Sequence, residues 1–161
     1  YLEVGVWKGA TLLSAAYGNY YGRFYGIDND SQFEDESDEF SDLELDHAEE
    51  LGSIDVYDWD AFTIDLKLPL FKEPLNVYFY DGAHDRESHR KALTYFYPVL
   101  ANQFIFVCDD WNTPGDHVQR GTMEGISECR LQQRYGATIG TDKIQDRLGW
   151  WNGLFVAVLE K

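Results

Sequence analysis

The first eleven residues, YLEVGVWKGAT, constrain the fold more than any other stretch. β-forming residues up to Val6 favour a strand, and residues 11–16 favour a helix. Gly5 and Gly9 permit backbone conformations that a side chain would block. A strand that enters a helix through such a turn leaves backbone N–H groups where an anionic or polar ligand can bind. Glycine turns also occur in α/β folds without a ligand, so that alternative stays open.

The rest of the chain alternates between apolar and amphipathic segments. We expect further strands over residues 24–28, 53–57, 75–80, 104–108, 137–140 and 154–159, and helices over residues 9–17, 84–97 and 118–135. This alternation predicts an α/β fold in one domain spanning 1–161. The predicted fold is a Rossmann-like three-layer sandwich whose sheet is mostly parallel with an antiparallel C-terminal strand. Because the sequence opens inside a strand, we expect the natural chain to begin earlier.

Charge and composition narrow the possible partners. The chain has 29 acidic and 13 basic residues, a net charge of −16, which argues against nucleic acid as a partner. No apolar run reaches membrane-spanning length and no signal peptide is visible. Two cysteines make no disulfide framework, so we expect a cytoplasmic protein. Homo-oligomer formation stays open, and the acidic segment 31–51 is interpreted as a solvated helix-like excursion.

Acidic side chains follow the carboxyl ends of several predicted strands, where open α/β sheets bind their ligands. They are Asp28, Asp60, Asp81, Asp109 and Asp110. At such a position Asp28 can accept hydrogen bonds from ribose hydroxyls, although a simple turn aspartate is the alternative. Asp60 can accept from an amino group while Trp59 or Phe62 offers a flat apolar wall. A structural loop at Asp60 is the competing interpretation.

Asp81 and the pair Asp109-Asp110 close two strands that we expect to be neighbours. Three converging carboxylates would repel one another and raise one another's pKa unless a cation is present. Oxygen ligands from aspartates suit magnesium or manganese, so these residues are candidate metal ligands. The alternative is that Asp81 caps a helix and the pair faces water.

His84 is the candidate general base. It follows Asp81 by three residues, and a histidine near its ordinary pKa can accept a hydroxyl proton at neutral pH. The alternative is an ordinary residue in the first turn of a helix. His89 is expected on a charged helix face in contact with solvent. His47 and His117 have no comparable neighbours in the sequence.

These motifs resemble a known family. The spacing Glu3-x-Gly5-x-x-x-Gly9 resembles motif I of the class I S-adenosylmethionine (SAM)-dependent methyltransferases. The runs Asp81-Gly82-Ala83-His84 and Asp109-Asp110-Trp111, separated by a helix and a strand, resemble the small-molecule O-methyltransferases of the macrocin type and the wider methyltransferase-24-like group. The likeness extends from Glu3 to about Gly121.

The resemblance implies roles for particular residues. Those lining the SAM site would be Glu3, Gly5, Trp7, Gly9, Thr11, Asp28, Asp60, Phe62 and Asp81. Magnesium, or another divalent cation, would be held by Asp81, Asp109 and Asp110, and His84 would be the base. The loop 111–116 has no counterpart in the family, which leaves the acceptor undefined.

The sequence therefore predicts a SAM-dependent methyltransferase acting on a hydroxyl group of a small molecule, with divalent-metal assistance. A non-catalytic SAM-binding or regulatory module with the same fold is the first alternative. A different α/β enzyme, such as a nicotinamide-dependent reductase, is the second. The glycine spacing argues against that enzyme, because dinucleotide-binding turns place their glycines closer together.

Overall fold

The computed structural model describes residues 1–29, 51–140 and 152–161. The described chain forms two compact units, Tyr1–Asp65 and Leu66–Lys161. The interpretation of the acidic segment therefore concerns residues that lie almost entirely outside the described ranges. The single-domain assignment stays a prediction.

The described residues of the first unit form a parallel sheet and helix α1. Its elements are β1 (Leu2–Val4), α1 (Ala10–Ala16), β2 (Arg23–Asp28) and β3 (Ser53–Asp58). The strand order is β3-β2-β1, and the parallel register pairs Val4 with Ile27 and Asp28 with Asp58. The core of this unit is formed by Val6, Leu12, Ala16 and Phe24. This packing places the β1–α1 turn beside the carboxyl end of β2.

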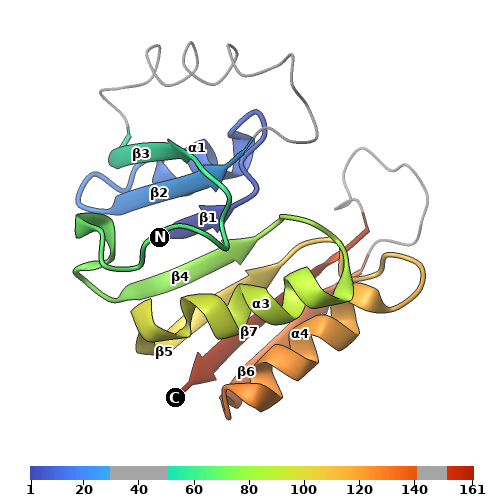
Figure 1. The fold of residues 1–161 in the computed structure, drawn as a ribbon. Helices are drawn as coiled ribbons and strands as arrows, with labels where there is room; N and C mark the ends of the chain where they lie inside the picture. Colours follow the sequence, from blue (N-terminus) through green and yellow to red (C-terminus); the bar gives the residue numbers. More distant parts are fainter. Residues whose placement is uncertain (30–50, 141–151) are drawn as a thin grey trace. The chain divides into compact units, whose positions relative to one another are not determined.

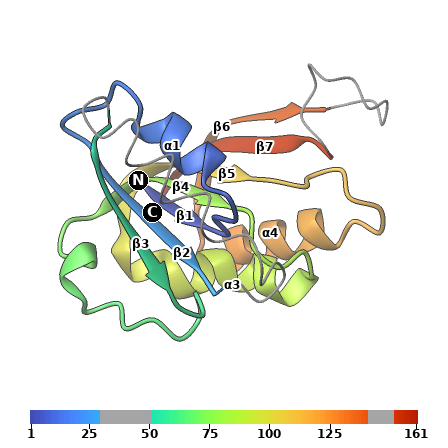
Figure 2. The same ribbon diagram turned by 90° about the horizontal axis from the view of Figure 1, so that it is seen from above.

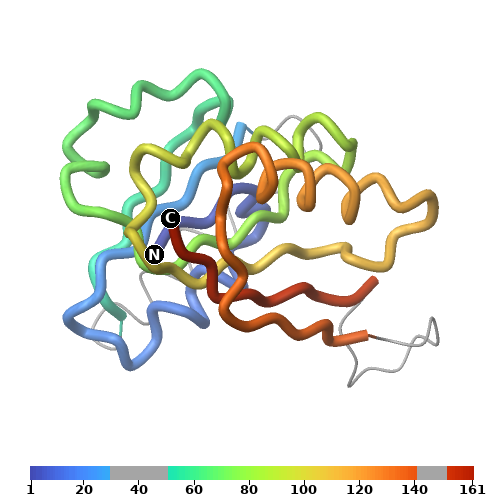
Figure 3. Tube along the Cα trace, turned by 90° about the horizontal axis from the view of Figure 1, so that it is seen from below, coloured from blue at the N-terminus to red at the C-terminus, as the bar shows by residue number. Residues whose placement is uncertain are grey.

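The described residues of the second unit form a mixed sheet with helices α3 and α4 (Figure 1). The elements are β4 (Leu75–Tyr80), α3 (Arg86–Phe96), β5 (Leu100–Cys108), α4 (His117–Glu128), β6 (Gln132–Ile139) and β7 (Leu154–Glu160), with short 3-10 turns at Pro69–Phe71 and Tyr97–Val99. The strand order is β4-β5-β7-β6. β4 and β5 are parallel, whereas β7 is antiparallel to both β5 and β6. The orange and red segments of Figure 3 show β6 and β7 side by side. The expected antiparallel C-terminal strand is present.

Helices α3 and α4 cover one face of this second sheet (Figures 1 and 2). The rings of Tyr78, Phe96 and Phe106 form an aromatic core. The centroid of the Tyr78 ring lies 5.4 Å from that of Phe96 and 5.5 Å from that of Phe106. The two helices approach closely at Gly121, where a Cβ atom would lie 2.2 Å from the Arg86 carbonyl oxygen. No helix in the described ranges is both long and apolar enough to span a bilayer.

Two helix predictions need correction. The helix expected over 84–97 is α3, which begins after Asp85. The Asp85 carboxylate accepts hydrogen bonds from the Ser88 N–H and hydroxyl (3.0 and 2.5 Å), so His84 precedes the helix. The helix expected over 118–135 ends at Glu128, and Gln132–Ile139 is a strand. Pairing with β7 overrides the helical preference of this polar segment.

The expected solvent exposure of His89 is wrong. This side chain is 1% exposed, and its Nε2 is buried with no hydrogen-bond partner among the described residues. It shares the buried face of α3 with Ala92, Leu93 and Phe96. These three residues follow His89 by three, four and seven positions, a spacing that indicates a shared helix face. The charged residues around His89 obscured this pattern in the sequence.

Candidate functional site

The turn between β1 and α1 has a backbone that favours glycine. The φ angles are 86° at Gly5, 45° at Trp7 and 75° at Gly9, all in the left-handed region. The Gly5 N–H donates to the Ile27 carbonyl (2.9 Å), and the Gly9 N–H donates to the Val6 carbonyl (2.8 Å). The two glycines therefore allow a tight turn at the start of α1, where polar ligands are commonly bound.

Asp28 holds this turn in place. Its Oδ2 accepts hydrogen bonds from the backbone N–H groups of Val6 (2.6 Å) and Trp7 (2.8 Å). Hydrogen bonds to a charged acceptor are stronger than those between neutral groups. The two hydrogen bonds to this carboxylate oxygen therefore fix the turn against the end of β2. The structure thus places Asp28 at the carboxyl end of β2 and shows a positioning role that sequence reasoning missed. Its contact with ribose stays a prediction.

Glu3 lies beneath the turn and is fully buried. Its two carboxylate oxygens accept hydrogen bonds from the hydroxyls of Tyr1 and Thr11, each at 2.5 Å. Because Thr11 belongs to α1, Glu3 ties the helix to β1. Trp7, by contrast, is 54% exposed at the tip of the turn. Glu3 and Thr11 therefore support the turn, and Trp7 presents a large apolar surface beside it.

The residues after β3 form a turn of their own. The Asp60 Oδ1 accepts from the Phe62 N–H (2.8 Å), and its carbonyl accepts from the Thr63 N–H and hydroxyl (both 3.0 Å). The Trp59 N–H donates to the Asp28 carbonyl (2.7 Å), which brings this turn to the end of β2. Asp60 has the geometry of the structural alternative, a local turn, and its adenine contact stays a prediction.

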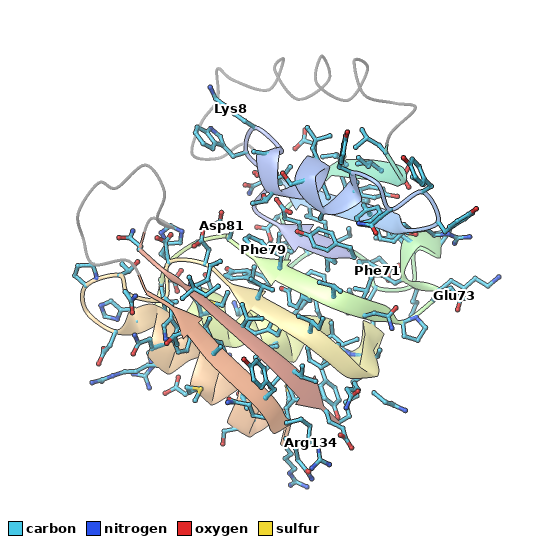
Figure 4. The ribbon with its side chains drawn as sticks, turned by 180° about the vertical axis from the view of Figure 1, so that it is seen from behind. Lys8, Phe71, Glu73, Phe79, Asp81 and Arg134 are labelled. Atoms are coloured by element: carbon cyan, nitrogen blue, oxygen red, sulfur yellow. The ribbon has the colours of Figure 1, made fainter. Side chains whose placement is uncertain are left out.

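The second unit brings three functional side chains together at the ends of β4 and β5. Asp81 follows β4 directly, at the opposite end of the strand from Glu73 (Figure 4). The His84 Nε2 lies 2.8 Å from the Asp110 Oδ2 and 3.8 Å from the Asp81 Oδ1. Parallel pairing of Tyr80 with Cys108 explains the convergence, because it ends both strands at the same edge.

The three side chains shift one another's protonation. The hydrogen bond to Asp110 and the nearby carboxylate of Asp81 raise the pKa of His84 to about 10. Burial raises the pKa of Asp81, although the nearby His84 opposes this effect. Burial alone would also raise the pKa of Asp110, but hydrogen bonds from His84 and Asn152 outweigh it and lower that pKa. Without another cation, His84 is therefore an imidazolium at neutral pH.

The three side chains fit a divalent cation. One donor atom from each of Asp81, His84 and Asp110 lies within 4.8 Å of the others. Carboxylate oxygens suit magnesium and manganese, and imidazole suits zinc and iron. The positive charge of a cation would offset the two carboxylates as the imidazolium does here.

The predicted ligand set differs from this cluster in one member. Among the described residues, His84 completes the group with Asp81 and Asp110, whereas Asp109 is outside it. The Asp109 Oδ1 accepts from the Asp110 N–H (2.7 Å), and the Asp109 N–H donates to the Tyr80 carbonyl (3.1 Å). Metal binding by Asp81, Asp109 and Asp110, and the base role of His84, stay predictions.

A family model described as a methyltransferase domain matches residues 2–111. The chain belongs to this methyltransferase family. The match includes the glycine turn, Asp28, Asp81, His84 and Asp110, and it ends at Trp111. The resemblance to class I SAM-dependent methyltransferases of the methyltransferase-24-like group is confirmed. A search of curated proteins gives no match.

Solved methyltransferases share the fold of this domain at low sequence identity. An O-methyltransferase of Streptomyces achromogenes involved in tomaymycin synthesis, solved with SAM, is 17% identical with a TM-score of 0.68, covering 99% of this chain and 72% of its own. A Bacillus cereus O-methyltransferase solved with S-adenosylhomocysteine (SAH) is 16% identical with a TM-score of 0.63, covering 99% and 73%. The N-methyltransferase NodS of Bradyrhizobium japonicum is 14% identical with a TM-score of 0.65, covering 99% and 84%. These likenesses confirm the predicted Rossmann-like fold.

Proposed function

We propose that this methyltransferase domain uses SAM to methylate a hydroxyl group of a small molecule, with the assistance of a divalent cation. The observation that carries the proposal is the convergence of Asp81, His84 and Asp110 at the carboxyl ends of two parallel strands. Membership of a methyltransferase family supports the reaction class, and the two solved O-methyltransferases support a hydroxyl acceptor.

The turn held by Asp28 would hold the cofactor. Left-handed backbone at Gly5 and Gly9 lets the chain approach a ligand closely, and Asp28 keeps the turn in one conformation. Trp7, Asp60 and Phe62 would complete the site, while Glu3 and Thr11 support it from beneath. Bound SAM would supply a methyl group activated by its sulfonium charge. Crystal complexes of the two O-methyltransferases with SAH or SAM support this assignment.

The cluster of Asp81, His84 and Asp110 would bind the acceptor and handle its proton. A divalent cation held by the two carboxylates would supply positive charge that lowers the pKa of an acceptor hydroxyl and of His84. His84 is 45% exposed on its side chain, so an acceptor can reach its ring. Once deprotonated, its Nε2 would accept the hydroxyl proton, and Asp110 would stabilise the resulting imidazolium at 2.8 Å.

The test is methyl transfer from tritiated SAM to matched panels of hydroxyl and amine acceptors, with magnesium and with a chelator. We expect labelling of hydroxyl acceptors, lost with the chelator and in Asp81→Asn. Glu128→Gln, which removes an exposed carboxylate of α4, is the control and should stay active. Labelling of amines alone, or equal rates with the chelator, would contradict the proposal.

Calorimetric titrations of SAM and NAD beside this assay separate the alternatives. Saturable SAM binding without transfer to any acceptor would favour a non-catalytic SAM-binding module. Binding of NAD with none of SAM would favour a nicotinamide-dependent enzyme. Amine acceptors belong in the panel because the domain also shares its fold with an N-methyltransferase.

A further inference from the structure

Asn152 reaches the cluster from outside the segment that the family model matches. It lies directly before Gly153 and β7, 42 residues after Asp110 in the chain. Its side-chain Nδ2 donates to the Asp110 Oδ1 at 2.7 Å. The other oxygen of this carboxylate, Oδ2, lies 2.8 Å from the His84 Nε2. Each oxygen of Asp110 therefore has a distinct partner.

Backbone contacts hold Asn152 against the segment that follows β5. The Asn112 N–H donates to the Asn152 carbonyl (2.7 Å), and the Trp111 N–H donates to the Gly153 carbonyl (3.1 Å). The rings of Trp111 and Phe155 stack at 4.3 Å with an angle of 17° between their planes. These contacts fix the main chain of Asn152, so its side-chain amide is presented to Asp110 in a set position.

The backbone at both residues supports a specific role for this pair. Asp110 has a φ angle of 55° and Asn152 one of 56°, both in the left-handed region. Asparagine and aspartate tolerate that region better than most residues, but it remains costly. Such conformations persist where surrounding contacts hold them, and they occur often at functional sites. Here they aim two polar side chains at each other.

We infer that Asn152 is a positioning residue that fixes the carboxylate of Asp110 in the orientation used by the cluster. By binding Oδ1, the amide directs Oδ2 toward His84 and toward the cation or acceptor hydroxyl of the proposed function, on which this consequence rests. A neutral amide suits this role because it restrains the carboxylate without competing with a cation for its charge. A lysine or arginine at this position would neutralise the carboxylate instead.

Asn152→Gly is the decisive variant, because glycine keeps the left-handed backbone and removes only the amide. Manganese affinity is measured by the electron paramagnetic resonance signal of free Mn²⁺, and we expect it to fall about 10- to 100-fold. The variant's kcat should fall while SAH affinity is unchanged. Asn19→Gly is the matched control, since Asn19 donates its side-chain amide to the Ala15 carbonyl in the other unit. Wild-type manganese affinity and kcat in Asn152→Gly would overturn the inference.

Crystal structures of the wild type and Asn152→Gly without metal give a second readout. We expect the Asp110 carboxylate to rotate and its Oδ2 to leave His84 in the variant. An unchanged Asp110 would contradict the positioning role. If Asn152→Gly does not fold, Asn152→Asp, which has the same size and the same backbone tolerance, removes the donor and should release Asp110. A wild type that binds neither manganese nor SAM would refute the proposed function, whereas the crystal comparison would still decide the role of Asn152.

Discussion

The two units prepare their functional groups in different ways. In the first unit, backbone N–H groups and left-handed glycines make the turn, and the Asp28 carboxylate holds it. In the second unit, the side chains of Asp81, His84 and Asp110 are the candidate functional groups, and backbone pairing of β4 with β5 brings them together. One region is therefore defined by conformation and the other by charge.

This difference predicts which substitutions each region tolerates. A neutral substitution of the same shape should weaken cofactor binding only slightly when it is made in the turn, where geometry matters. The same kind of substitution in the cluster, where charge matters, should reduce activity strongly. A substitution that disturbs the backbone should matter more in the turn than in the cluster. Substitutions in the two regions can therefore test this contrast.

Removing charge from the cluster should have the largest effect. Asp81→Asn and Asp110→Asn keep the size of the side chains, and asparagine also tolerates the left-handed backbone at Asp110. We expect kcat/KM to fall about 100- to 1000-fold, the usual cost of removing one preorganised charge-stabilising group. The SAH affinity of Asp110→Asn, measured by calorimetry, should be unchanged. A fall of only a few fold would show that charge is not what the cluster provides.

Charge also distinguishes two histidines of the second unit, because the pKa of His84 is raised and that of His89 is lowered. Burial, with a smaller contribution from the nearby His84, lowers the pKa of His89 to about 4 against the opposing effect of Asp85 and Asp110. The ring also lies beside the Cys108 thiol, 3.5 Å from Nδ1, and the Tyr80 ring. In the unfolded chain the pKa of His89 is about 6.5. Folding therefore favours the neutral ring.

Stability should consequently fall as the pH falls from about 6.5 to 4, because only the unfolded chain takes up this proton in that window. The loss attributable to His89 is at most about 3 kcal/mol of unfolding free energy, and none is expected above pH 6.5. Urea denaturation of the wild type and His89→Leu across this range isolates it, since the carboxylates titrate in both proteins. Equal pH dependence in the two proteins would refute the prediction.

Alanine in the turn should weaken cofactor binding by a smaller factor. Gly5→Ala and Gly9→Ala each force an L-residue into the left-handed region, at a cost of about 1–2 kcal/mol. We expect SAH affinity to fall about 10-fold with manganese affinity unchanged. Gly18→Ala is the matched control, because Gly18 has a φ angle of 73°, no neighbouring atom within 4 Å of an added Cβ, and a place outside the turn. Equal SAH affinity in all three variants would contradict the account.

Asp28→Asn should give the smallest effect. The side-chain carbonyl of asparagine can still accept from the Val6 and Trp7 N–H groups, but the bonds lose their charge assistance, about 1 kcal/mol. A weakening of SAH binding by about 5-fold is expected from that difference, measured by the same calorimetry. Asp28→Ala, which removes the acceptor, should be several times worse. Similar affinities for the two variants would show that holding the turn is not the role of Asp28.

Local sequence signals predicted most of the fold and the positions of the acidic residues. Apolar runs ending in an aspartate located β2, β4 and β5 together with Asp28 and Asp81. What they could not reveal depends on contacts between distant residues. Nothing around Asn152 indicates that its amide meets a carboxylate 42 residues earlier. The position of Asp28 at a strand end also does not indicate that its carboxylate accepts from the N–H groups of Val6 and Trp7, 22 and 21 residues earlier. The first part of strand β6 was assigned to a helix for the same reason, because pairing with β7 extends the strand back to Gln132.

We propose above all that this domain binds the methyltransferase cofactor through the turn held by Asp28. Calorimetric titration of SAH into the wild type and into Gly9→Ala, with and without magnesium, measures this binding. We expect saturable micromolar binding to the wild type and weaker binding to the variant. Absence of binding under both conditions, or equal binding to the variant, would contradict cofactor binding through this turn.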